Sequence, residues 1–167
     1  MKNILLMGMP GSGKSSVAKF LSQNYFYKYI DTDVEITRQA NQSVPEIFKN
    51  HGERYFREVE HKVIKNIPPN KNLIIALGGG CVSYKKNFPV LKELGVKIYL
   101  YSRPKKIYRN IMCDKTNPRP LIKNYSSVKQ LFSKRYNIYK DLCDYIFDCN
   151  KFSNPDKIAQ KLICFIK

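Results

Sequence analysis

The chain has 167 residues, 43% of them hydrophobic, which is enough for one domain with a buried core and too few for two domains of ordinary size. Its formal net charge of +17 comes mostly from lysines that are spread along the sequence with no run longer than two. Such a spread is typical of a solvated surface, and no apolar run approaches the length of a membrane span. We therefore expect a protein that binds neither nucleic acid nor a membrane.

Cysteine and histidine spacings exclude two common ways of stabilising a small fold. The five cysteines are Cys81, Cys113, Cys143, Cys149 and Cys164. No two of them form a C-x-x-C pair, and the two histidines lie ten residues apart, so we expect neither a structural metal site nor a disulfide framework. Free cysteines favour a reducing compartment, and the apolar opening at 4–7 is too short for a signal peptide. We expect a cytoplasmic monomer.

Short apolar runs alternate with helical patterns along the chain. The apolar runs predict strands at 3–8, 29–33, 72–80, 97–104 and 144–148. The helical patterns cover 14–24 and 43–67 and begin again near 104, 127 and 155. Strands separated by helices, with glycines at strand ends, predict a three-layer α/β/α domain in which a parallel sheet is covered on both faces. No linker is visible, so the domain is expected to span 1–167.

The segment 43–67 carries signals for two consecutive helices. Ser43 and Glu46 form an S-x-x-E capping box, and Gly52 is placed to end the first helix. The second helix has apolar residues at helical spacing, which predicts core packing. On its other face Arg57 and Glu60 lie one turn apart, where a carboxylate can fix the direction of a guanidinium group.

The segment GMPGSGKS at 8–15 matches the phosphate-binding pattern G-x-x-x-x-G-K-[ST], with an apolar strand before it and an amphipathic helix after it. Gly8, Gly11 and Gly13 allow backbone amides to turn toward phosphate oxygens at the positive end of that helix. Lys14 is expected to reach the β- and γ-phosphates, and Ser15 to ligate Mg²⁺. The loop predicts nucleotide binding and leaves the phosphoryl acceptor open.

The sequence DTD at 31–33 ends the second predicted strand. Residues two apart in a strand point the same way, so Asp31 and Asp33 are expected to emerge together beside the phosphate loop. One carboxylate can then hold Mg²⁺ through a water while the other accepts a hydroxyl proton, as phosphoryl transfer to an alcohol requires. The alternative is a turn in which an aspartate only caps the following helix.

Three glycines, Gly78, Gly79 and Gly80, follow the third predicted strand. Ligands bind at the carboxyl ends of parallel strands, and these glycines are expected to leave bare backbone amides there. A tight turn from strand to helix is the alternative.

Only seven arginines occur in a chain that strongly prefers lysine. A guanidinium group makes planar, two-pronged contacts with carboxylate or phosphate that an ammonium group does not, although a surface salt bridge is an open alternative for any one of them. Arg119 lies in a polar, proline-bearing interruption between two helical patterns. We expect the segment 112–124 to be a mobile lid that excludes water during phosphoryl transfer.

These motifs, in this order, resemble those of the shikimate kinases, P-loop enzymes of aromatic amino-acid biosynthesis that are similar to nucleoside monophosphate kinases. The resemblance rests on the phosphate loop, DTD at 31–33, Phe56-Arg57 with Glu60, LGGG at 77–80, RPL at 119–121 and R-x-x-x-Y at 135–139. It covers nearly the whole chain and implies a five-stranded parallel sheet. It also implies transfer of the ATP γ-phosphoryl group to the 3-hydroxyl of shikimate, giving shikimate 3-phosphate and ADP in chorismate biosynthesis.

The resemblance implies an acceptor site built mainly on helices within 32–67. Asp33 would bind and polarise the shikimate hydroxyls and act in catalysis. Arg57 and Arg135 would grip the carboxylate, with Glu60 orienting Arg57. The implied substrate-binding set, in which two phenylalanines wall the ring, is Asp33, Phe48, Phe56, Arg57, Gly78, Gly79, Gly80 and Arg135.

The resemblance also implies the nucleotide site and its metal. Lys14 and Arg119 would act in catalysis, with Arg119 as the lid arginine at the transferred phosphate. Asp31 would hold Mg²⁺ through water beside Ser15. The implied ATP-binding set, in which Arg109 and Pro155 contact adenine, is Gly8, Gly11, Ser12, Gly13, Lys14, Ser15, Ser16, Arg109, Arg119 and Pro155.

Two alternative functions stay open beside this one. A gluconate- or nucleotide-directed P-loop kinase would need a different acceptor pocket, and the pairing of Arg57 with Arg135 argues for a carboxylate. A nucleotide-binding regulator or nucleic-acid-associated protein without turnover would lack Asp33 or the lid arginine, or would carry a basic stripe, and none of these features is seen. The main departure from the family pattern is Asn137, which stands where R-x-P-x-Y has proline and bears on the rigidity around Arg135.

Overall fold

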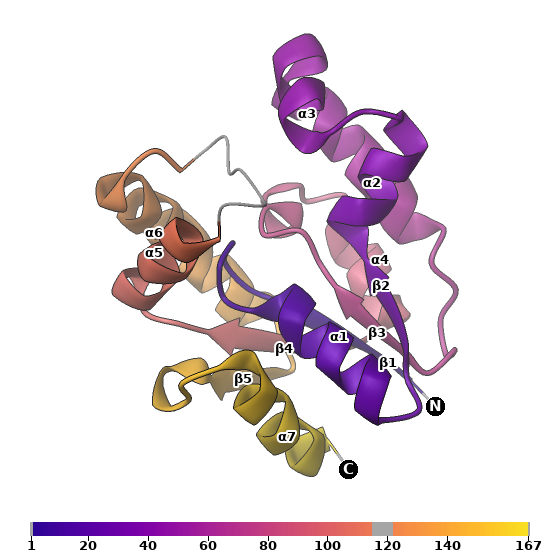
Figure 1. Ribbon diagram of the computed structural model, residues 1–167. Helices are drawn as coiled ribbons and strands as arrows, with labels where there is room; N and C mark the ends of the chain where they lie inside the picture. Colours follow the sequence, from indigo (N-terminus) through magenta and orange to yellow (C-terminus); the bar gives the residue numbers. More distant parts are fainter. Residues whose placement is uncertain (1, 115–121, 167) are drawn as a thin grey trace.

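The computed structural model describes residues 2–114 and 122–166, which form a parallel sheet with helices on both faces (Figure 1). Five strands lie in the order β2-β3-β1-β4-β5, and every neighbouring pair runs parallel. The strands are β1 (Asn3–Met7), β2 (Lys28–Asp31), β3 (Leu73–Ala76), β4 (Gly95–Tyr101) and β5 (Tyr145–Asp148). The predicted α/β/α class is confirmed, and all strands end at the same edge of the sheet.

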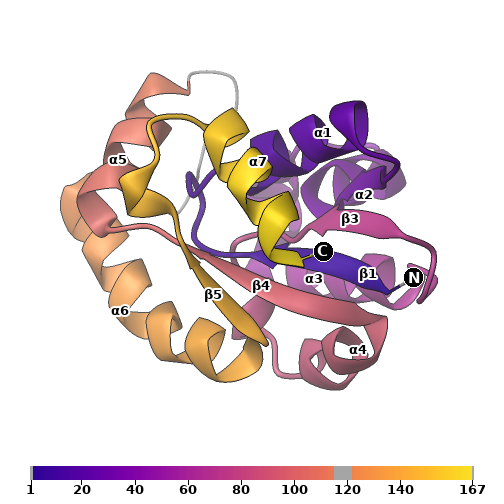
Figure 2. The same cartoon turned by 90° about the horizontal axis from the view of Figure 1, so that it is seen from below.

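Alternating side chains of the central strand reach two different cores. Leu5 and Met7 of β1 pack on one face with α3 (Val44–Lys65), α4, α5 and α6, whereas Ile4 and Leu6 pack on the other face with α1 and α7. Figure 2 shows α1 and α7 on one side of the sheet and α4 and α6 on the other. The helices are α1 (Lys14–Asn24), α4 (Asn87–Leu94), α5 (Pro104–Cys113), α6 (Tyr125–Leu142) and α7 (Pro155–Ile166).

Helices α2 (Thr32–Ala40) and α3 (Val44–Lys65) form a lobe with a small apolar core of its own. The predicted capping box is confirmed, because Ser43 Oγ accepts from the Glu46 N–H (3.4 Å) and the Glu46 carboxylate accepts from the Ser43 N–H (2.7 Å). Gly52 interrupts α3 at φ 78° and ψ 175°, as its position suggested. The second half of α3 then carries Arg57 and Glu60, which are both buried.

Some boundaries differ from the sequence-based expectation. Helix α4 is absent from the predicted elements, because its eight residues are too few to show a clear helical period. Helix α6 begins at Tyr125 rather than near Ser127, since the Asn124 side chain accepts from the Ser127 N–H at 2.9 Å and caps the helix two residues earlier. Residues 115–121 of the predicted lid, including Arg119, lie outside the described residues. Within the described part of the chain, no helix is long and apolar enough to cross a membrane.

Candidate active site

The phosphate loop connects β1 to α1 as its motif predicts. Gly11 and Gly13 have φ values of 77° and 93°, which side chains disfavour, and a Cβ at Gly11 would lie 2.7 Å from the Ile111 side chain. Gly13 is the N-cap of α1, so the loop places backbone amides at the positive end of that helix. Lys14 is buried at 7% exposure, and its Nζ donates to the carbonyls of Gly8 (2.9 Å) and Met9 (3.0 Å).

A cavity of about 400 Å³ lies over this loop, and we name it the phosphate cavity. Its walls are Gly11, Ser12, Gly13, Lys14, Ser15, Ser16, Lys106, Asn110, Cys113, Asp114, Ser153, Asn154, Pro155 and Ile158. Residues 11–16 of the predicted ATP-binding set and Pro155 therefore surround one space, whereas Gly8 of that set does not line it. Arg109 is exposed and is not among the lining residues, whereas Lys106 and Asn110 of the same helix are. Asn110 Nδ2 donates to the Gly11 carbonyl at 2.9 Å, a tertiary contact that no local motif announces.

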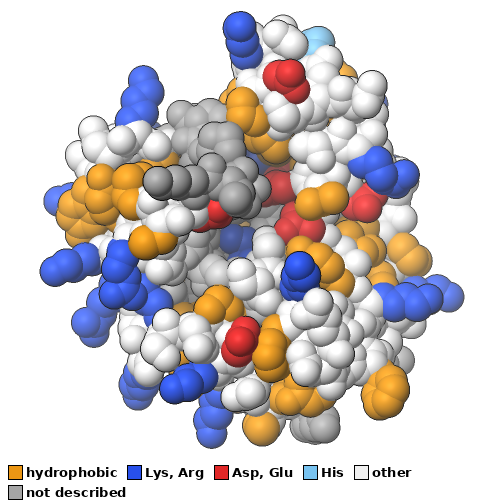
Figure 3. All heavy atoms as spheres, in the orientation of Figure 1, with side chains coloured by type: hydrophobic (Ala, Val, Ile, Leu, Met, Phe, Trp, Pro, Cys, Tyr) orange, Lys and Arg blue, Asp and Glu red, His pale blue; other side chains and the backbone are white. Residues whose placement is uncertain are grey.

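A second cavity of about 540 Å³ lies between the α2–α3 lobe and the sheet, and we name it the acceptor cavity. Its walls include Pro10, Ser15, Tyr29, Asp31, Asp33, Phe48, Phe56, Arg57, Glu60, Gly79, Gly80 and Arg135. All the predicted acceptor residues except Gly78 line it, and Ser15 belongs to both cavities. Acidic side chains gather in and beside the hollow next to the lobe, and most of the Lys and Arg side chains on this face are scattered around its rim (Figure 3).

The DTD segment brings both carboxylates to the acceptor cavity, but not by the strand geometry we expected. Strand β2 ends at Asp31, and Thr32 and Asp33 already belong to α2. Asp31 caps that helix, because its Oδ1 accepts from the Asp33 N–H at 3.0 Å. Its Oδ2 accepts from the Tyr29 hydroxyl at 3.0 Å. Asp31 therefore caps the helix and also lines the cavity, and Asp33 reaches the same cavity from the first turn of the helix.

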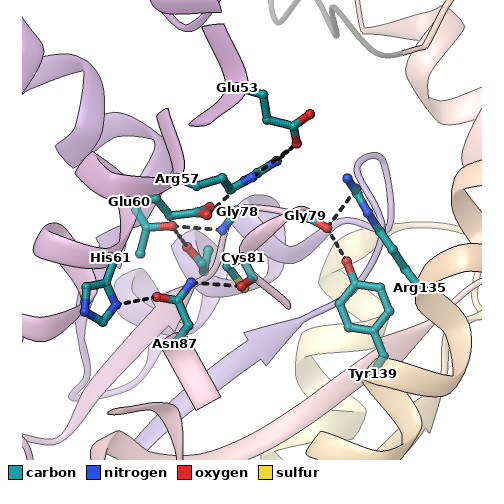
Figure 4. A network of polar contacts seen from close by, with 12 residues as sticks. Glu53, Arg57, Glu60, His61, Gly78, Gly79, Cys81, Asn87, Arg135 and Tyr139 are labelled. Atoms are coloured by element: carbon teal, nitrogen blue, oxygen red, sulfur yellow. Dashed lines mark hydrogen bonds and ion pairs between the residues drawn. The ribbon is translucent and has the colours of Figure 1, made fainter. Parts of the chain in front are cut away.

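Arg57 is held by two carboxylates of its own helix (Figure 4). Its Nη1 donates to Glu60 Oε2 at 2.8 Å, and its Nη2 donates to Glu53 Oε1 at 3.0 Å. Burial acts to lower the pKa of the guanidinium group, but Glu60 and Glu53 outweigh it and raise the pKa. The group also lies over the Phe56 ring, with 5.1 Å from Cζ to the ring centroid. Arg57 is therefore a fixed positive charge in the wall of the acceptor cavity.

Glu60 is fully buried, and its Oε1 atom has no hydrogen-bond partner among the described residues. Burial raises the pKa of this carboxyl group, Arg57 lowers it, and the result is about 7. A Cβ added at Gly78 would lie 2.7 Å from this oxygen and 2.5 Å from Asp33 Oδ1. The two carboxylates thus crowd the same point above the glycine loop.

We name the loop 78–80 the acceptor loop. Its carbonyl groups and the Cα atoms of its glycines contact neighbouring side chains, and not all of its amides are free to bind a ligand. The Gly78 N–H donates to Thr32 Oγ1 at 2.8 Å, so the prediction of bare amides is wrong at this residue. The Gly79 carbonyl instead accepts from Arg135 Nη1 at 3.0 Å. A Cβ at Gly80 would fall inside the Arg57 guanidinium group. These glycines let two buried charged side chains approach the backbone.

Asn87 and His61 form a polar pair that contacts Cys81, the residue after the acceptor loop. The buried Asn87 side chain donates from Nδ2 to the Cys81 carbonyl at 2.8 Å. Its Oδ1 lies 2.8 Å from His61 Nδ1, which must therefore carry the hydrogen. The Cys81 thiol is fully buried and burial raises its pKa, so it is not a reactive thiolate.

The residues at the junction of the two cavities suit Mg²⁺ bound mainly by phosphate and water. Ser15 supplies a hydroxyl oxygen there, and Asp31 supplies a carboxylate whose two oxygens already accept hydrogen bonds. Mg²⁺ keeps several of its waters and takes few protein ligands, so contact with Asp31 through water fits this arrangement. No group of three or more His, Cys, Asp and Glu side chains that could hold a metal is present in the described residues.

Comparison with known proteins agrees with this geometry. The family model for shikimate kinase matches residues 10–167. The chain belongs to the shikimate kinase family. It is 37% identical over 166 residues to shikimate kinase from Caldicellulosiruptor bescii, and the alignment covers 98% of this chain and 94% of that one. It is also 37% identical over 152 residues to shikimate kinase from Clostridium botulinum strain Loch Maree, and that alignment covers 90% of this chain and 89% of the relative.

Solved structures of the family share the fold. Shikimate kinase from Acinetobacter baumannii in complex with shikimate superposes with a TM-score of 0.91 at 30% identity, covering 99% of this chain and 93% of that one. The enzyme from Aquifex aeolicus superposes with a TM-score of 0.81 at 27% identity, covering 98% and 95%. The sequence-based resemblance and the five-stranded P-loop fold it implied are thus confirmed.

Proposed function

We propose that the protein transfers the γ-phosphoryl group of ATP to the 3-hydroxyl of shikimate, giving shikimate 3-phosphate and ADP. Membership of the shikimate kinase family makes the chain an ATP-dependent kinase of the shikimate pathway. The observation that carries the proposal for this chain is a pair of buried arginines, Arg57 and Arg135, in a cavity that shares Ser15 with the phosphate loop.

The acceptor carboxylate is bound by the two arginines in this proposal. Arg57 and Arg135 are 7% and 5% exposed, and each has N–H groups beyond those that its protein partners occupy. Buried guanidinium groups favour a planar anion and disfavour a neutral ligand. Phe48 and Phe56, with ring centroids 4.9 Å apart, supply an apolar wall for the carbocyclic ring. Gly79 and Gly80 let the ring substituents approach the backbone.

Asp33 is the proposed base for the acceptor hydroxyl. It lines the acceptor cavity next to Glu60, and its carboxylate can accept the proton that leaves the hydroxyl oxygen as the phosphorus–oxygen bond forms. Lys14 and the amides of the phosphate loop hold the transferred phosphate and balance its charge. Arg119, the lid arginine suggested by the family resemblance, lies outside the described residues.

Mg²⁺ is the proposed metal, held by Ser15 directly and by Asp31 through water. When bound, it neutralises charge on the β- and γ-phosphate oxygens. The same nucleotide is contacted by Ser12, Ser16 and Pro155 in the wall of the phosphate cavity. Lys106 and Asn110 also line this cavity, and Arg109, which is exposed on the same helix, is the proposed contact to adenine together with Pro155.

We also propose that the enzyme works as a cytoplasmic monomer. All five cysteines are free thiols, which suits a reducing compartment. Size-exclusion chromatography with light scattering measures the oligomeric state directly.

A coupled assay of ADP release tests the proposed function. Shikimate, gluconate and nucleoside monophosphates are supplied in parallel, and the phosphorylated product is identified by mass and by ³¹P NMR. We expect turnover with shikimate alone and a product phosphorylated at the 3-hydroxyl. Turnover with gluconate or a nucleotide but not with shikimate contradicts the proposal and favours the alternative P-loop kinase.

A further inference from the structure

We propose that Tyr139 is a positioning residue whose hydroxyl ties the phosphate loop to the acceptor loop. The inference rests on the proposed function and adds a residue that belongs to neither predicted binding set. Tyr139 lines neither cavity, so any effect on the reaction must pass through the groups it holds.

The Tyr139 hydroxyl lies between two backbone carbonyls that are far apart in sequence. It is 2.9 Å from the carbonyl oxygen of Gly8 and also hydrogen-bonds the carbonyl of Gly79. Gly8 follows β1 and Gly79 follows β3, which are neighbouring strands. Figure 4 shows Tyr139 and Arg135 reaching from α6 to the same carbonyl of Gly79. One side-chain atom thus contacts both glycine loops.

Each of these carbonyls also accepts from a charged side chain of a different cavity. Lys14 Nζ donates to the Gly8 carbonyl at 2.9 Å, and Arg135 Nη1 donates to the Gly79 carbonyl at 3.0 Å. A continuous chain of contacts therefore runs from the lysine of the phosphate loop to an arginine of the acceptor cavity, with the Tyr139 hydroxyl at its centre. A phenol carries one hydrogen, so the Tyr139 hydroxyl contacts the two carbonyls through one shared, three-centre hydrogen bond.

The ring that bears this hydroxyl is held firmly. Tyr139 is fully buried and stacks on Tyr99 of β4, with ring centroids 4.9 Å apart and planes 17° apart. Arg135 lies one turn before it on α6, so the same face of the helix presents both donors. Burial raises the pKa of the Tyr139 hydroxyl, which keeps it protonated and able to donate.

This placement bears on the chemical step more than on binding. The nucleotide and the acceptor contact different loops, and the distance between those loops sets the distance from the γ-phosphorus to the acceptor oxygen. Reaction rates depend steeply on such distances, whereas each ligand keeps its own contacts when the loops shift slightly. Loss of the tie should therefore lower kcat and leave both KM values nearly unchanged.

The test is Tyr139→Phe, which removes the hydroxyl and keeps the stacked ring, compared with Tyr99→Phe. The control removes a hydroxyl from the same stack, and among the described residues the hydroxyl that hydrogen-bonds Gly8 and Gly79 belongs to Tyr139 and not to Tyr99. We expect Tyr139→Phe to lower kcat at least about tenfold and to change KM for ATP and for shikimate less than about threefold. Tyr99→Phe should keep its kcat within about twofold of wild type.

Kinetics are recorded ten degrees below the melting midpoint of the least stable variant, so that unfolded protein does not contribute. A kcat of Tyr139→Phe within twofold of wild type, or an equal fall in both variants, overturns the inference. A rise in KM for shikimate with kcat intact also overturns it, because Tyr139 then supports the binding site only. If wild-type protein does not phosphorylate shikimate, the proposed function fails first, so the two failures are distinguishable.

Discussion

The two cavities that meet at Ser15 differ in how their walls are built. The phosphate cavity takes six of its fourteen wall residues from one consecutive stretch, 11–16, which offers backbone amides and a lysine to a phosphate chain. The acceptor cavity is lined by side chains from several elements, and three of them, Arg57, Glu60 and Arg135, are charged and buried. The phosphate chain, which many proteins bind, is therefore contacted mainly by backbone amides. The acceptor, which is specific to this family, is contacted by charged side chains that are fixed by burial and by ion pairs.

The largest expected effect comes from the acceptor cavity. Asp33→Asn keeps the size of the side chain but cannot accept the hydroxyl proton, so kcat should fall by about 10²- to 10⁴-fold while ADP affinity stays unchanged. Steady-state kinetics and calorimetry measure the two quantities. Glu35→Gln is the matched control, since Glu35 lies on the same helix and pairs with Arg38 at the surface. A variant that keeps more than about a tenth of wild-type kcat would place the base elsewhere.

The buried carboxylate of Glu60 predicts a pH effect on stability. Its pKa of about 7 is above that of an unfolded glutamate, because burial outweighs the attraction of Arg57 and Arg135 and adds to the repulsion of Asp33. A raised acid pKa stabilises the fold at low pH, and this contribution is lost as pH rises through 7. Relative to Glu60→Gln, wild type should lose about 3 kcal/mol of unfolding free energy between pH 4.5 and pH 8.

Urea unfolding of wild type and Glu60→Gln at both pH values measures this difference, and groups that titrate alike in the two proteins cancel. A difference in unfolding free energy that does not change with pH contradicts the assignment of the shift to Glu60.

The smallest expected effect is the protection of a cysteine by a ligand, which tests whether the two cavities bind different ligands and needs no substitution. Cys113 is exposed and lines the phosphate cavity, whereas Cys164 is exposed on α7 and Cys81 is buried. ADP should slow the modification of Cys113 by a thiol reagent severalfold, and shikimate should leave it unchanged. Modification is followed by peptide mass spectrometry, with Cys164 as the internal control. Protection of Cys113 by shikimate alone would show that the two cavities are not separate.

The phosphate loop could be predicted from sequence because its ligand-facing groups are consecutive. One stretch, 8–15, with a strand before it and a helix after it, fixes the positions of its amides and of Lys14. Lys106 and Asn110 could not be found in this way. They enter the phosphate cavity only because α5 packs against the loop, a tertiary contact with no local signature, whereas Arg109 on the same helix came from the family resemblance and its contact with adenine stays a prediction.

The identity of the residues that line the acceptor cavity could be predicted, but the backbone conformation that brings them together was predicted less well. The family resemblance supplied its residues, and Asp31 and Asp33 do share the cavity. The strand argument for that pair is wrong, because Asp31 ends the strand by capping α2, and capping competes with strand continuation wherever an aspartate precedes a helix. Nothing in the sequence predicted that the Tyr139 hydroxyl reaches Gly8 and Gly79, since three elements must first pack together. The roles assigned to Arg119 and to the lid at 112–124 stay predictions.

The claim that Arg57 recognises the acceptor carboxylate can be tested with one ratio. This ratio is kcat/KM for shikimate over kcat/KM for its carboxamide, measured for wild type, for Arg57→Lys and for Arg54→Lys. Arg54 is the matched control, because it lies on the same helix with a side chain 93% exposed. Loss of one charge-assisted contact should lower the ratio about 10- to 100-fold in Arg57→Lys, with KM for ATP unchanged, and leave it at the wild-type value in Arg54→Lys. A ratio in Arg57→Lys equal to that of wild type would contradict the account.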